Sequence, residues 1–61
     1  MSVKPKVGQI WKHKKTGDRV EVKKILYSQV KVFDMDGSNY GKQFLVDNAD
    51  FITQYRLIKD V

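Results

Sequence analysis

The residues of this chain whose types could support a chemical function are several lysines and an arginine close to Gly17 in the sequence. Residues 8–22, GQIWKHKKTGDRVEV, include the only tryptophan and the only histidine of the chain among several basic side chains. Lysine and arginine bind nucleic-acid phosphates and release counterions, and aromatic rings stack on unpaired bases. The types and spacing of these residues are therefore typical of a surface that binds polyanions.

The positive charge is concentrated in one half of the chain. Residues 1–31 hold nine Lys and Arg against two acidic residues, a net charge of +7, whereas residues 32–61 hold three against five, a net charge of −2. Such an asymmetry indicates a basic face that binds nucleic acid or an acidic protein surface, although a net charge of this size is also ordinary for a soluble small domain.

Nucleic-acid binding is the function that this pattern favours. If Val20 and Val22 face a core, the residues between and beside them point outward. The predicted phosphate contacts are Lys12, Lys14, Lys15, Arg19, Lys23 and Lys31. The aromatic candidates for base stacking are Trp11, Tyr27 and Tyr40, with a place in the core as the alternative for Trp11. No helix is expected to be long enough to fill a major groove, so binding without sequence specificity is predicted.

A protein-interaction adaptor or inhibitor is the alternative function. Small barrels present open sheet edges and loops, and a basic face can dock on an acidic protein surface. The acidic residues Asp34, Asp36, Asp47 and Asp50 in the second half of the chain favour this alternative. A protein that coats nucleic acid would keep such side chains away from its ligand.

Catalytic and metal-binding patterns are missing, which predicts a non-enzymatic protein without a cofactor or metal. His13 has no neighbouring residues that make a nucleophile pair, and no phosphate-binding loop or zinc-ligand spacing occurs. In a calcium loop starting at Asp34, the sixth and twelfth positions would be Asn39 and Leu45 instead of glycine and glutamate. Asp34, Asp36 and Asn39 are interpreted as turn residues.

Short strands are expected to position these side chains. Alternating apolar residues predict strands near residues 9–13, 19–26, 30–35, 42–46 and 55–59. The alternation slips at residues 23–25, which predicts a β-bulge. Gly17 and the Asp36-Gly37 pair predict turns. Asp47 is expected to cap one helical or 3₁₀ turn before the last strand, with Asp50 in that turn.

Sixty-one residues allow one domain, predicted to span residues 1–61 with residues 1–6 as a flexible N-terminal arm. The chain has no cysteine, which suits a reducing compartment. It has neither a secretory signal nor an apolar run long enough to span a membrane. We therefore expect a cytoplasmic location and no membrane partner.

A set of glycine, aromatic and aliphatic positions carries a resemblance to known proteins. These positions are Gly8, Trp11, Gly17, Val20, Val22, Phe44, Tyr55, Leu57 and Ile58. Over almost the whole chain the pattern resembles the small SH3-like barrels of bacteriophages and prophages. TGDRVEV is also similar to the opening of KOW modules, which contact RNA or proteins, but the second glycine of those modules is absent. The resemblance implies an all-β, five-stranded SH3-like barrel and a phage-related origin, but no activity.

Overall fold

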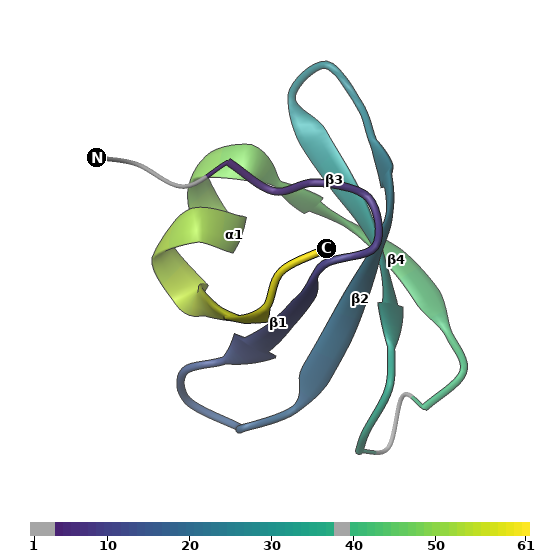
Figure 1. Cartoon of the computed structure of the whole chain (residues 1–61), viewed down its shortest axis with the longest axis vertical. Coiled ribbons are helices and arrows are strands. Elements are labelled where there is room, and N and C mark those ends of the chain that lie inside the picture. The colour runs from purple at the N-terminus through teal and green to yellow at the C-terminus, as the bar shows by residue number, and fades with distance from the viewer. Residues whose placement is uncertain (1–3, 38–39) are drawn as a thin grey trace.

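Five antiparallel strands form a single sheet in a computed structural model of the chain, which describes residues 4–37 and 40–61 (Figure 1). The elements are β1 (Ile10–His13), β2 (Arg19–Ile25), β3 (Gln29–Asp34), β4 (Gln43–Asp47), α1 (Asn48–Gln54) and β5 (Tyr55–Lys59). The sheet order is β4-β3-β2-β1-β5, and α1 lies against one side of the sheet. This confirms the expected all-β, small barrel-like fold with a short helix before the last strand.

Buried valines at every second position of the central strands β2 and β3 build the core. Val20 and Val22 on β2 and Val30 and Val32 on β3 are fully buried on one face, which we call the inner face. The residues between them point to the opposite, outer face. The predicted bulge is confirmed, because the register between β2 and β3 shifts between Val22 and Lys24.

Trp11 belongs to this core, so the prediction that it stacks on bases is wrong. It pairs with Val20 on the inner face, and only 3% of its surface is exposed. Its ring lies 4.8 Å from that of Phe51 on α1, centroid to centroid. A side chain enclosed between the sheet and the helix cannot receive a base without unfolding of α1.

The helix is longer than the single turn expected from the sequence. It has seven residues, and the buried Phe51 side chain stacks on Tyr55 with ring centroids 4.8 Å apart. Asp47 occupies the N-cap position, but the prediction that its side chain caps the helix is wrong. It makes no capping hydrogen bond, and its Oδ1 accepts a hydrogen bond from Gln29 Nε2 instead. Asp50 lies in the first turn, as predicted. No helix of the described residues is long and apolar enough to cross a membrane.

Gln9 is a buried polar residue that joins both ends of the chain to the core. Its Oε1 accepts hydrogen bonds from the Lys6 backbone N–H at 2.7 Å and from Trp11 Nε1–H at 3.1 Å. Its Nε2 donates to Asp60 at 2.8 Å. Residues 1–3 of the expected N-terminal arm lie outside the described residues, as does Asn39. Lys6, at the end of that arm, is bound to Gln9 through its backbone.

Gln9→Leu is expected to lower the free energy of unfolding by about 1–3 kcal/mol, because it leaves the buried Trp11 N–H without an acceptor. Urea unfolding followed by Trp11 fluorescence measures this change. Gln43→Leu is the matched control, since Gln43 is exposed on the edge strand β4, and its effect is expected within about 0.5 kcal/mol. Equal effects of the two changes would contradict the role of Gln9.

Candidate anion-binding site

A basic hollow of about 320 Å³ lies at the connection between β1 and β2. Its lining residues are Lys12, His13, Lys14, Lys15, Thr16, Gly17 and Arg56. Lys12, Lys14, Lys15 and Arg56 are all exposed, so their charged groups are accessible to a ligand. We call this site the hairpin hollow. It brings together three of the six cations predicted from the sequence.

His13 shapes the loop that forms the hollow. Its Nδ1 accepts hydrogen bonds from the backbone N–H groups of Lys15 at 3.1 Å and Thr16 at 3.2 Å. Gly17 closes the turn with a positive φ of 81°, as predicted, and donates its N–H to the His13 carbonyl. The histidine ring also contacts Tyr55 edge-on. The contacts of His13 with the loop backbone hold Lys14 and Lys15 at the tip of the hairpin.

Arg56 is the cation of the hollow that sequence reasoning missed. Lys12 on β1 pairs with Arg19 on β2 on one side and with Arg56 on β5 on the other. These three residues therefore form one row across the outer face. The pairing of the last strand with the first, which the barrel-like fold requires, was the signal that could have placed Arg56 beside Lys12.

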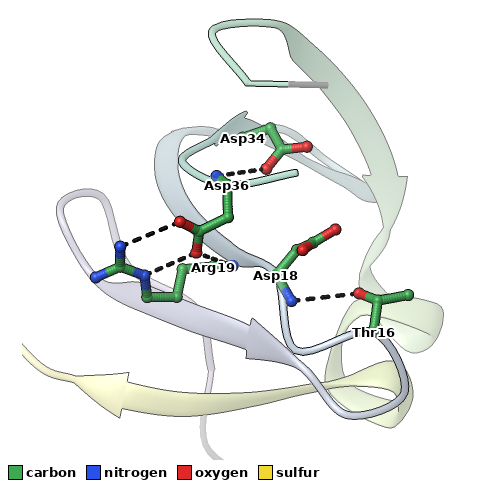
Figure 2. Close-up of polar contacts among 5 residues, drawn as sticks. All are labelled: Thr16, Asp18, Arg19, Asp34 and Asp36. Carbon is green, nitrogen blue, oxygen red and sulfur yellow. Dashed lines mark hydrogen bonds and ion pairs between the residues drawn. The ribbon is translucent and has the colours of Figure 1, made fainter. Parts of the chain in front are cut away.

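Arg19, one of the predicted phosphate contacts, is already bound by an acidic side chain (Figure 2). Its Nε donates to Asp36 Oδ2 at 2.8 Å, and its Nη2 donates to Asp36 Oδ1 at 3.2 Å. The Arg19 backbone N–H also donates to Asp36, whose own N–H donates to Asp34. Arg19 thus anchors the β3–β4 connection, and its guanidinium is already paired with a carboxylate.

The contact between Arg19 and Asp36 makes the free energy of unfolding depend on pH in the acid range. The hydrogen bonds from Arg19 lower the pKa of Asp36, so the folded state favours the ionised carboxylate. A lowered pKa stabilises the fold above the unfolded value of about 4, and this stabilisation is lost as the pH falls through the folded pKa.

We therefore expect Asp36→Asn to be less stable than the wild type at pH 6 and to approach it as the pH falls below about 4. Urea unfolding at a series of pH values measures the difference in free energy of unfolding. A difference that stays constant over the whole pH range would contradict the contribution of the Asp36 charge.

The other predicted residues lie away from the hairpin hollow. Lys23 lies in the bulge of β2 and Lys31 lies on β3 opposite Lys24, just past that bulge; Lys23 Nζ is 3.4 Å from Glu21 Oε2. Tyr27, 94% exposed, is in the β2–β3 connection, at the opposite end of the sheet from the β1–β2 connection (Figure 1). The single continuous basic surface expected from the sequence is therefore divided, with Glu21 between its two parts.

The part of the chain that the structure describes does not bring three or more His, Asp or Glu side chains together as metal ligands. Comparisons of the chain with models of protein families, with curated proteins and with solved structures gave no match.

Proposed function

We propose that the protein binds the backbone of nucleic acids without sequence specificity, through the hairpin hollow. The observation that carries this proposal is the charge of the hollow. Among residues 4–37 and 40–61, Lys12, Lys14, Lys15 and Arg56 form no ion pair, whereas Arg19 and Lys23 do. Cations without an ion-pair partner, held around one concave surface, gain more electrostatic energy from a bound anion than cations that are already paired with a carboxylate.

The physical basis of the binding is the release of counterions from phosphates. Each phosphate that the protein neutralises makes the affinity decrease more steeply with salt concentration. Four contacts with a single strand predict a slope of about −3 in a plot of log K against log salt. Base-specific readout is not part of the proposal, because α1 spans only about 10 Å and does not match a major-groove reader. The proposed function is binding and involves no catalysis.

A titration of labelled oligonucleotides at several salt concentrations tests the proposal. We expect dissociation constants below about 100 µM at about 50 mM salt for single-stranded DNA and RNA, with the salt slope given above. Absence of binding to single-stranded and duplex DNA and RNA under these conditions would overturn it.

A protein partner is the second candidate function, and exposed apolar residues on the edge strands favour it. Leu45 on β4 is 50% exposed and Ile58 on β5 is 45% exposed. Both strands lie at the ends of the sheet order, where a partner can add a strand. Cell extracts treated with nuclease distinguish the two functions. Capture that survives nuclease and is lost in Ile58→Glu supports a protein partner, whereas capture that nuclease abolishes supports nucleic-acid binding.

A further inference from the structure

Two aromatic side chains lie together on the outer face of the sheet. Phe33, on β3 with strands on both sides, is half-buried and points away from the core between Val32 and Asp34. Tyr40, in the β3–β4 connection, is 71% exposed. Their ring centroids are 6.5 Å apart at an interplanar angle of 67°. We call Phe33 and Tyr40 the aromatic pair.

The aromatic pair is within reach of a ligand held in the hairpin hollow. Phe33 pairs with Glu21 on β2, two residues from Arg19, which in turn pairs with Lys12 of the hollow. Strand spacing and rise give a separation of about 12 Å between the backbones of Lys12 and Phe33. The β1–β2 and β3–β4 connections also lie at the same end of the sheet (Figure 1). One short strand of nucleic acid can therefore contact both features.

The charges around the aromatic pair favour a base over a phosphate. Glu21 lies directly opposite Phe33 and repels a phosphate at this position. Lys23 pairs with Glu21 at 3.4 Å and places its ammonium 5.3 Å from the centroid of the Phe33 ring. Phosphates are attracted to the hollow, while an uncharged aromatic base gains stacking contacts on the outer face.

We infer that the ligand is single-stranded nucleic acid, with its phosphates in the hairpin hollow and its unpaired bases stacked on Phe33 and Tyr40. This inference rests on the proposed function and extends it, because bases paired in a duplex have no free face to stack on these rings. Of the three residues predicted to stack on bases, it keeps Tyr40 in that role, and it adds Phe33 in place of the buried Trp11.

The experiment compares two ligands of equal charge: an oligothymidine of about ten nucleotides and an abasic oligonucleotide of the same length. The wild type is expected to bind the oligothymidine about tenfold more tightly than the abasic strand. Tyr40→Leu, at an exposed position outside the strands, is expected to remove most of this preference while leaving abasic binding unchanged. Phe33→Leu, which keeps an apolar cover over the sheet, is expected to act in the same direction.

Tyr27→Leu is the matched control, because Tyr27 is exposed at the opposite end of the sheet. It is expected to leave the preference for bases unchanged. Equal binding of the two ligands by the wild type, or a loss of preference only in Tyr27→Leu, would overturn the inference while the proposed function stands. Binding of neither ligand would overturn both.

Discussion

The double variant Lys14→Glu/Lys15→Glu is expected to bind single-stranded nucleic acid at least about tenfold more weakly than the wild type. It removes two of the four cations of the hairpin hollow and adds two charges that repel phosphate. The slope of log K against log salt is expected to fall from about −3 to about −1.5, since half of the phosphate contacts are lost. Fluorescence anisotropy of a labelled oligonucleotide at several salt concentrations measures both quantities.

A control variant with the same change in net charge distinguishes the contribution of the hairpin hollow from that of the net charge of the protein. Lys4→Glu/Lys59→Glu changes two exposed lysines that do not line the hollow. It is expected to reduce the affinity less and to leave the salt slope near that of the wild type. An unchanged slope in Lys14→Glu/Lys15→Glu would show that the hairpin does not contact phosphates.

Phe51→Ala is expected to remove a large part of the stability of the fold, lowering the free energy of unfolding by about 3–5 kcal/mol. The Phe51 side chain is fully buried and packs between Trp11 and Tyr55, with ring centroids 4.8 Å from each. Loss of a buried phenylalanine costs about 3–5 kcal/mol. The total stability of a domain of this size is about 3–9 kcal/mol. Thermal and urea unfolding followed by circular dichroism measure the loss.

Ile52→Ala is the matched control on the same helix. Ile52 follows Phe51 but is 37% exposed, so its truncation removes fewer contacts and is expected to cost about 1 kcal/mol or less. Similar losses in the two variants would contradict the role of Phe51 as the residue that fixes α1 to the sheet.

The strands and the core of this protein could be predicted from local patterns. The alternation around Val20 and Val22 determines which face of β2 is buried, and a slip in that alternation indicates the bulge at Lys23. The length of α1 was underestimated because a contact that fixes it to the sheet, Phe51 on Trp11, joins residues that are 40 positions apart. Local patterns carry little information about such distant contacts.

The site was only partly predictable for the same reason. Lys12, Lys14 and Lys15 were found because they are neighbours in the sequence. Arg56 reaches them only through the pairing of β5 with β1, and Asp36 pairs with Arg19 from 17 residues away. The aromatic pair depends on both the pleat of β3 and the path of the β3–β4 connection.

Nuclear magnetic resonance of nitrogen-15-labelled protein tests the central claim most directly, because it locates the ligand on the protein. On addition of an oligothymidine of about ten nucleotides at about 50 mM salt, we expect the largest amide shifts at Lys14, Lys15, Thr16 and Gly17, with smaller shifts at Arg56. Shifts concentrated at Leu45 and Ile58 on the edge strands, or no shifts at all, would contradict binding in the hairpin hollow.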